Sequence, residues 1–198
     1  MYHNMPAYNN ITTIAAATVA DWRAWLRRHG QKQKSVWLVL YKKESDMASI
    51  DYSTAVDEAL CWGWVDSKIN KRDAASWYQY FAQRSAKSNW SRVNKEKIAL
   101  LEKEGRIQPA GWAVIEAAKK SGTWTALDAV EKGIIPNDLQ TAFTKNKKAA
   151  GYFDAFPRSV KRAILEWINT AKKEETRAAR IAKTVAMAAE NKRANYPQ

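Results

Sequence analysis

The chain has 198 residues, of which 46% are hydrophobic and 27% are charged, values that are ordinary for a globular protein. Its 33 basic residues outnumber its 20 acidic ones, and a formal charge of +13 favours polyanions such as nucleic acid as partners. A single cysteine excludes an intramolecular disulfide, and neither a signal peptide nor a membrane-spanning stretch is recognisable, so we expect a cytoplasmic protein.

The first half of the sequence predicts helices mixed with strands. Apolar residues at helical spacing predict helices over 21–29 and from about 51 to 62, each followed by a glycine. A continuous apolar run predicts a buried strand over 36–41. Two aromatic runs joined by a short polar turn, 64–70 and 77–82, predict a hairpin.

The first strand of this hairpin alternates in character. Strict alternation places Trp64, Asp66, Lys68 and Asn70 on one face of the strand and the intervening residues on the other. The face that carries Asp66 and Lys68 is therefore expected to be polar.

The pattern becomes helical after residue 89. Ser91 is expected to cap a helix that ends near Gly105. Further helices are expected after Pro109, Pro136, residue 147 and Pro157, and from about 174 to 190.

These elements predict an α+β fold with a small, mostly antiparallel sheet and a crossing helix, followed by a helical C-terminal half. We expect a single domain over residues 1–198. Its parts would be a mixed α/β part (10–86), a helical part (87–190) and a tail (191–198).

Known catalytic signatures are mostly absent. There is no glycine-rich phosphate loop, and the spacing of His3, His29 and Cys61 matches no zinc pattern, so we expect neither a metal site nor a cofactor. Cys61 stands between Leu60 and Trp62, as buried thiols often do. An enzyme that uses Asp66 or Cys61 remains an alternative, but the sequence favours a protein without catalysis.

Polar residues around the aromatic strands indicate a ligand site. Asp66, Lys68 and Arg84 would line a cleft with Trp64 and Trp90, polar at its floor and aromatic at its walls. Such a cleft suits an organic anion or a nucleotide. The competing interpretation is a structural ion pair between Asp66 and Lys68, or an exposed strand face.

The junction from 84 to 94 is the second candidate. It combines hydroxyls, amides and cations where a strand gives way to a helix, and free N–H groups at a helix start attract anions. Ser88, Ser91 and Asn94 would complete the ligand site with Trp90. The alternative is that the three polar residues are caps and turn residues and that Trp90 belongs to the core.

A basic segment near the C-terminus offers a different kind of site. Lys173, Arg177, Arg180 and Lys183 fall near one helical face. A solvated face is the usual explanation, and non-specific binding of nucleic acid is the alternative.

Four segments resemble the YdeI/OmpD-associated family, also called bacteriocin-protection proteins. They are, in chain order, 36–43, 55–67, 87–94 and 167–181. The sequence departs from the family pattern at 81–84, where Gln83 replaces a proline that usually precedes the arginine.

The resemblance implies protection against bacteriocins or association with an outer-membrane porin, and it implies no enzymatic mechanism. The hypothesis is therefore a non-enzymatic, cytoplasmic bacteriocin-protection or stress-type protein that binds an anionic ligand or a partner protein. Non-specific nucleic-acid binding through the basic C-terminal helices is the second hypothesis.

Overall fold

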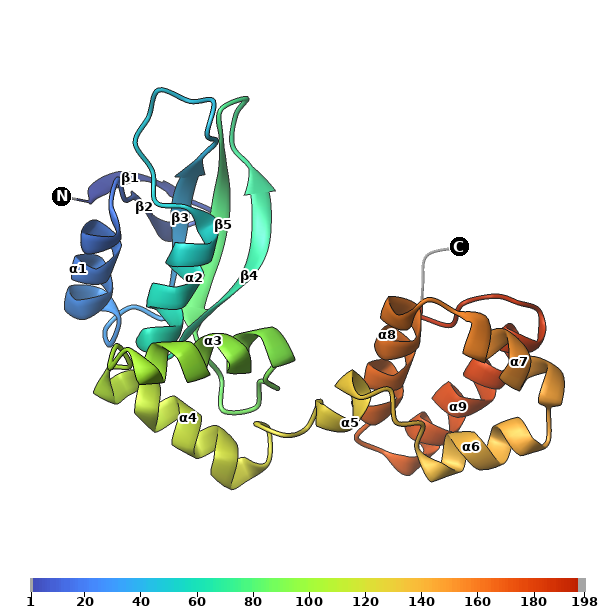
Figure 1. Cartoon of the computed structure of the whole chain (residues 1–198). Coiled ribbons are helices and arrows are strands. Elements are labelled where there is room, and N and C mark those ends of the chain that lie inside the picture. Colours follow the sequence, from blue (N-terminus) through green and yellow to red (C-terminus); the bar gives the residue numbers. More distant parts are fainter. Residues whose placement is uncertain (1, 196–198) are drawn as a thin grey trace. The chain divides into compact units, whose positions relative to one another are not determined.

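The computed structural model describes residues 2–195, and the chain divides after Thr125 into two compact units (Figure 1). We call residues 1–125 the sheet unit and residues 126–198 the helical unit. The part expected to be helical, 87–190, spans both units, because its first two helices belong to the sheet unit. A single domain over the whole chain stays a prediction.

The described part of the sheet unit contains five strands and four helices. In chain order they are β1 (His3–Tyr8), β2 (Ile11–Ala15), α1 (Val19–His29), β3 (Ser35–Tyr41), α2 (Tyr52–Cys61), β4 (Trp64–Lys71), β5 (Ser76–Gln83), α3 (Arg92–Lys103) and α4 (Pro109–Ser121). The strands form one sheet of order β1-β2-β3-β5-β4, in which only the β2–β3 pair is parallel. The predicted α+β fold with a mostly antiparallel sheet is confirmed.

Local chemistry explains where the first two helices begin. Thr18 caps α1, and Asp21 completes a reciprocal capping box by accepting from the backbone N–H of Thr18. Asp51 caps α2 by accepting from the backbone N–H of Thr54 at 3.0 Å. Both helices therefore start where the sequence changes from loop to apolar spacing.

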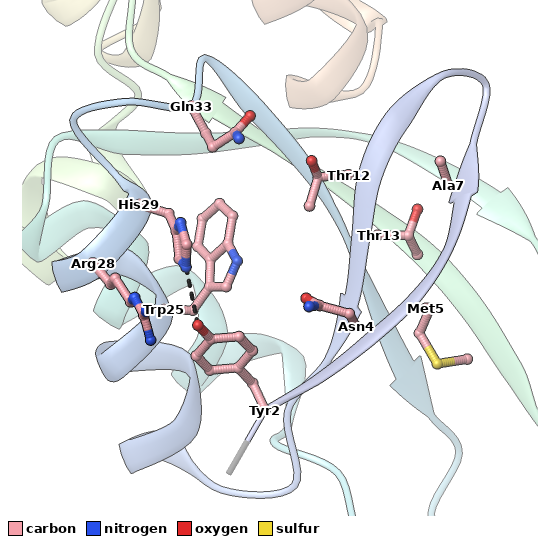
Figure 2. A pocket seen from close by; sticks show the side chains of 10 residues that line it. All are labelled: Tyr2, Asn4, Met5, Ala7, Thr12, Thr13, Trp25, Arg28, His29 and Gln33. Carbon is pink, nitrogen blue, oxygen red and sulfur yellow. Dashed lines mark hydrogen bonds between the residues drawn. The ribbon is translucent and has the colours of Figure 1, made fainter.

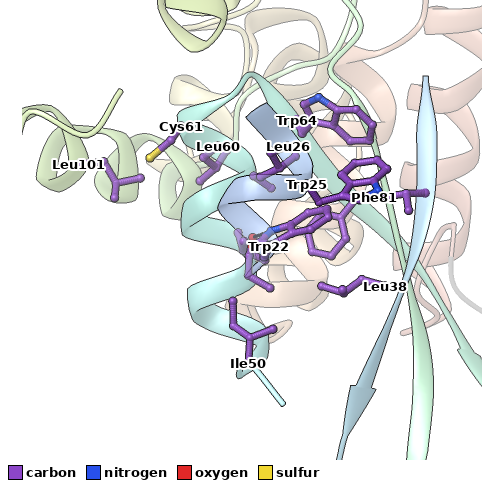
Figure 3. Close-up of a cluster of buried hydrophobic side chains, with 14 of the residues drawn as sticks. Trp22, Trp25, Leu26, Leu38, Ile50, Leu60, Cys61, Trp64, Phe81 and Leu101 are labelled. Carbon is purple, nitrogen blue, oxygen red and sulfur yellow. Dashed lines mark hydrogen bonds between the residues drawn. The ribbon is translucent and has the colours of Figure 1, made fainter. Parts of the chain in front are cut away.

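The core of the sheet unit lies between these helices and one face of the sheet (Figure 3). Trp22 and Trp25 of α1 stack with ring centroids 5.3 Å apart, and both are almost fully buried. Leu38 of β3 and Phe81 of β5 supply the sheet side of this core. Tryptophan-rich packing thus fixes the helices on the sheet.

An irregularity in β4 changes the predicted faces of that strand. Asp66 lies opposite Phe81, whereas Ile69 lies opposite Gln79, so one extra residue is inserted between the two pairs. Such a bulge reverses the alternation of the residues that follow it.

The predicted common face of Asp66, Lys68 and Asn70 is therefore wrong. Asp66 accepts a hydrogen bond from the hydroxyl of Tyr52 in α2 at 2.5 Å, on the side of the helices. The Lys68 ammonium lies 6.0 Å from the ring centroid of Tyr80, and the Asn70 amide donates to the hydroxyl of Tyr8. Lys68 and Asn70 thus belong to the opposite face.

The described part of the helical unit contains five helices. They are α5 (Asp128–Glu131), α6 (Asn137–Thr144), α7 (Lys147–Ala155), α8 (Arg158–Asn169) and α9 (Glu174–Ala189). Val160, Ile164 and Ile168 form a buried stripe of α8, and they belong to the hydrophobic core of this unit. No helix among residues 2–195 is both long and apolar enough to cross a membrane.

Candidate functional site

Arg84 follows β5 and is the most unusual polar side chain of the sheet unit. Its side chain is buried, with only 7% exposed. The guanidinium carbon lies 3.8 Å from the ring centroid of Trp90, and Nη2 donates to the backbone oxygen of Asn89 at 2.6 Å. The guanidinium therefore lies over the ring of a buried tryptophan.

The rest of the guanidinium of Arg84 has no partner. Nε and Nη1, which carry three of its five N–H donors, are sealed from solvent and form no hydrogen bond. No carboxylate among residues 2–195 forms an ion pair with this side chain. Burial lowers the pKa of Arg84 to about 10, although the charge of Asp66 opposes this effect.

Glu58 is a buried charge of the opposite sign in the same unit, and it has charged partners. Its side chain is 2% exposed, and it accepts hydrogen bonds from Arg23 at 2.7 and 2.9 Å and from Arg106 at 2.5 Å. Burial disfavours its ionised form, yet the two arginines outweigh burial and hold the pKa of Glu58 below its usual value. Glu58 is thus neutralised within the fold, whereas Arg84 is not.

A cleft of about 200 Å³ lies beside Arg84. Its lining comes from the turn after α1, the α2–β4 junction, the end of β5 and one face of α4, and the lining residues are Gly30, Gln31, Trp62, Gly63, Trp64, Gln83, Arg84, Ala110, Ala113 and Val114. The ring nitrogen of Trp64 and the amide of Gln83 both donate to the backbone oxygen of Gly30, at 3.2 and 2.8 Å.

Gly63 shapes this cleft through its backbone. Its φ of +74° lies in the left-handed region, and a Cβ atom there would stand 2.9 Å from Cγ2 of Val114. The backbone oxygen of Gly63 accepts from the N–H of Arg84 at 2.9 Å. The glycine therefore allows α4 to approach the arginine closely.

The structure brings together three of the predicted site residues. Trp64 and Arg84 line the cleft, and Trp90 supports Arg84 from below. Asp66 affects Arg84 through its charge and not through a contact, because its carboxylate is hydrogen-bonded to the hydroxyl of Tyr52. Lys68 lies on the other face of the sheet and takes no part.

The polar residues of the predicted junction, 84–94, form hydrogen bonds that stabilise the backbone of the helix start and the turn before it. The hydroxyl of Ser91 caps α3 by accepting from the N–H of Asn94 at 3.3 Å, and the N–H of Ser88 donates to the backbone oxygen of Ser85. The cleft beside Arg84 is lined by none of the three residues Ser88, Ser91 and Asn94. The placement agrees with the cap and turn interpretation of these residues.

Cys61 lies in an environment that disfavours nucleophilic chemistry. The side chain is 1% exposed, and burial raises the pKa of the thiol to about 12, with the charge of Glu58 adding to the effect. The thiolate is therefore scarce at neutral pH. Among residues 2–195 no group of three His, Cys, Asp or Glu side chains is arranged to hold a metal ion.

A larger cleft of about 480 Å³ lies between the β1–β2 hairpin and α1 (Figure 2). At one end the hydroxyl of Tyr2 and Nε2 of His29 are hydrogen-bonded at 2.9 Å. Burial, aided by the charges of Arg28 and Lys32, lowers the pKa of His29. The cleft holds no buried polar side chain without a partner, so Arg84 provides the better-defined site.

The basic residues predicted near the C-terminus are partly occupied. Arg177 pairs with Asp138 at 2.5 and 3.0 Å. Arg180 donates to the backbone oxygen of Trp167 and lies over the ring of that residue, 5.1 Å from its centroid. Lys183 is exposed, as is Lys173, the residue before α9. Two of the four cations therefore fasten α9 inside the helical unit.

Two family models match the chain. Residues 14–114 match a domain of unknown function, DUF8412, and residues 132–191 match the family described as bacteriocin-protection, YdeI or OmpD-associated. The second match confirms the resemblance over the C-terminal segment, whereas the three earlier segments lie in the first match. No curated protein and no solved structure matches the chain.

Proposed function

We propose that this chain, which belongs to the DUF8412 family and carries a bacteriocin-protection, YdeI or OmpD-associated segment over residues 132–191, acts without catalysis by binding a small organic anion at Arg84. The supporting observation is a buried guanidinium with three N–H donors that lack acceptors. A buried unpaired charge is costly, and an anion at this position would offset the cost.

The dimensions of the cleft indicate the kind of ligand. A volume of about 200 Å³ is smaller than the range of roughly 300 to 1,000 Å³ typical of drug-sized ligands. A carboxylate suits the unpaired guanidinium donors once the atoms that cover them move aside, and a short organic group suits the side chains of Trp62 and Val114. Small organic acids therefore fit better than nucleotides or polyanions.

A thermal-shift screen with small carboxylates and inorganic phosphate at low salt tests the site. A true ligand present at 100 times its Kd stabilises the fold by about 2.7 kcal/mol. Arg84→Gln should abolish the shift, because it removes the unpaired charge.

Arg92→Gln is the matched control, since Arg92 is an exposed arginine nearby in sequence that pairs with Glu96. If Arg84→Gln retained the shift of every ligand found, Arg84 would not be the binding residue.

We further propose a role in protection against bacteriocins, which the family match over residues 132–191 supports. We place the protein in the cytoplasm, because its one cysteine is suited to a reducing compartment. Expression of the protein in a bacteriocin-sensitive bacterium should raise survival, and cell fractionation should recover the protein in the cytoplasmic fraction. Loss of protection in Arg84→Gln, with normal expression, would link the ligand to that role.

A further inference from the structure

A further cleft lies in the helical unit, where it is lined by α5 with the turn after it, the end of α7 and the first turns of α8. Its volume of about 470 Å³ falls within the range of small-molecule sites. Ile135 is half-buried and packs against the core that contains Val130, Phe153 and Leu165, so the cleft has an apolar floor. The last three side chains belong to the core of the unit, so the floor is rigid.

Charged side chains surround this apolar floor. The rim residues are Lys132, Arg158, Lys161, Arg162, Glu131 and Asp154. Arg162 is neutralised, because it pairs with Glu131 at 3.1 Å and with Glu166 at 3.1 Å. The rim nevertheless has a net positive charge.

Arg158 and Lys161 are the rim cations that carry most weight. Arg158 donates to the backbone oxygen of Glu131 at 3.1 Å, and Lys161 donates to the backbone oxygen of Asp154 at 2.9 Å. Neither forms an ion pair with a carboxylate among residues 2–195. Both stand in the first turn of α8, which has no side-chain cap and whose positive dipole end favours an anion.

We propose that this cleft binds a single-chain amphipathic anion. The alkyl chain lies over Ile135 and the aliphatic parts of the rim side chains, and a carboxylate or phosphate head group contacts Arg158 and Lys161. A free inorganic ion would make no use of the apolar floor, and a neutral chain would leave both cations without a counterion. A nucleic acid would need a longer cationic track than this rim, which also carries two carboxylates.

The cleft is independent of the anion site at Arg84. All its lining residues belong to the helical unit, and most of them fall in the segment that matches the bacteriocin-protection family. Failure at one site therefore leaves the other unaffected.

Calorimetric titration of the full chain with decyl phosphate, below its micelle concentration, tests the site. Inorganic phosphate supplies the head group alone, and decyl maltoside supplies a chain with a neutral head. Decyl phosphate should bind at least tenfold more tightly than either. Affinity should rise about fourfold per added methylene until the cleft is filled, as expected for about 0.8 kcal/mol per buried methylene.

Substitution of the two rim cations separates the head-group contacts from the rest of the fold. Arg158→Gln combined with Lys161→Gln should weaken decyl phosphate at least tenfold, as expected when charged hydrogen bonds are lost. Lys183→Gln changes an exposed cation elsewhere in the unit and should leave affinity unchanged. If the double variant has a lower melting temperature, Lys161→Gln alone should show a smaller loss in the same direction.

Three results would overturn the site. Inorganic phosphate binding as tightly as decyl phosphate would indicate an ion site only. Decyl maltoside binding as tightly would indicate an apolar surface only. Equal affinity of the wild type and the double variant would exclude Arg158 and Lys161 as the head-group contacts.

Discussion

Glu58 and Arg84 are two buried charges with opposite surroundings. Glu58 is held by Arg23 and Arg106, whereas Arg84 has one backbone acceptor and a tryptophan ring. Removal of one member of a buried ion pair leaves its partners uncompensated, but removal of a charge that already lacks a partner does not. The two residues should therefore respond differently to substitution.

Glu58→Gln is expected to lower the free energy of unfolding by about 1.5 to 3 kcal/mol, because the charged hydrogen bonds from Arg23 and Arg106 are lost while both arginines keep access to solvent. Arg84→Met is expected to change it by no more than about 1 kcal/mol, because the lost ring contact and hydrogen bond are offset by the lost charge burial. Urea unfolding measures both. A loss at Arg84 as large as that at Glu58 would make Arg84 a structural residue.

The depressed pKa of Glu58 also predicts how the free energy of unfolding depends on pH. Its pKa is depressed in the folded state, so the unfolded chain binds the proton more readily and ionised Glu58 stabilises the fold above the unfolded pKa. This contribution is lost as the pH falls through the unfolded value towards the folded one. The free energy of unfolding should therefore drop from pH 6 to pH 3, and the drop should be smaller in Glu58→Gln. Equal pH profiles would contradict this role.

At the scale of elements, the pattern of apolar residues predicted α1 and α2 from helical spacing, β3 from a continuous buried run, and β4 and β5 from two aromatic runs. It did not predict β1 and β2. β1 is a mostly exposed edge strand that contains Pro6, so it lacks the apolar alternation of a half-buried strand. Edge strands of this kind are defined by their pairing and not by their own sequence.

The sequence predicted only part of the candidate site, again because strand pairing is not encoded in the local sequence. Trp64, Arg84 and Trp90 were identified from their residue types, but the bulge in β4 separates Lys68 from Asp66. The bulge depends on how β4 pairs with β5, which local alternation does not encode. The cationic cleft at α8 was missed because its lining residues come from α5, α7 and α8, which are separate in the sequence. The polar residues at the start of α8 were its only local signal.

Gly63 gives a test at the α2–β4 junction. Gly63→Ala should be more destabilising than Gly105→Ala, although both glycines have a positive φ. An added Cβ at Gly63 meets Val114 at 2.9 Å, whereas one at Gly105 meets nothing within 4 Å. We expect a cost of about 1 kcal/mol from the backbone at both sites, with a further steric cost at Gly63 alone. Equal melting temperatures for the two variants would show that α4 moves to accommodate the added Cβ at Gly63 without a loss of stability.

At the scale of the whole molecule, the net charge of +13 predicts some attraction to polyanions. Any affinity for nucleic acid should fall steeply with salt, and filter-binding measurements at several salt concentrations test this.

Arg177→Gln should lower the stability of the helical unit by about 1 kcal/mol, because the paired contacts with Asp138 are lost. Lys183→Gln should leave stability unchanged, and a strong effect of Arg177→Gln on nucleic-acid affinity alone would argue for a binding role.

The boundary after Thr125 separates the two hydrophobic cores and also the two family matches, since one ends at residue 114 and the other begins at residue 132. Each unit thus has its own core and its own family match, along with its own candidate site. Recombination at this boundary would join or part the two halves without cutting through either core, so genomes can be expected to hold each half fused to other neighbours.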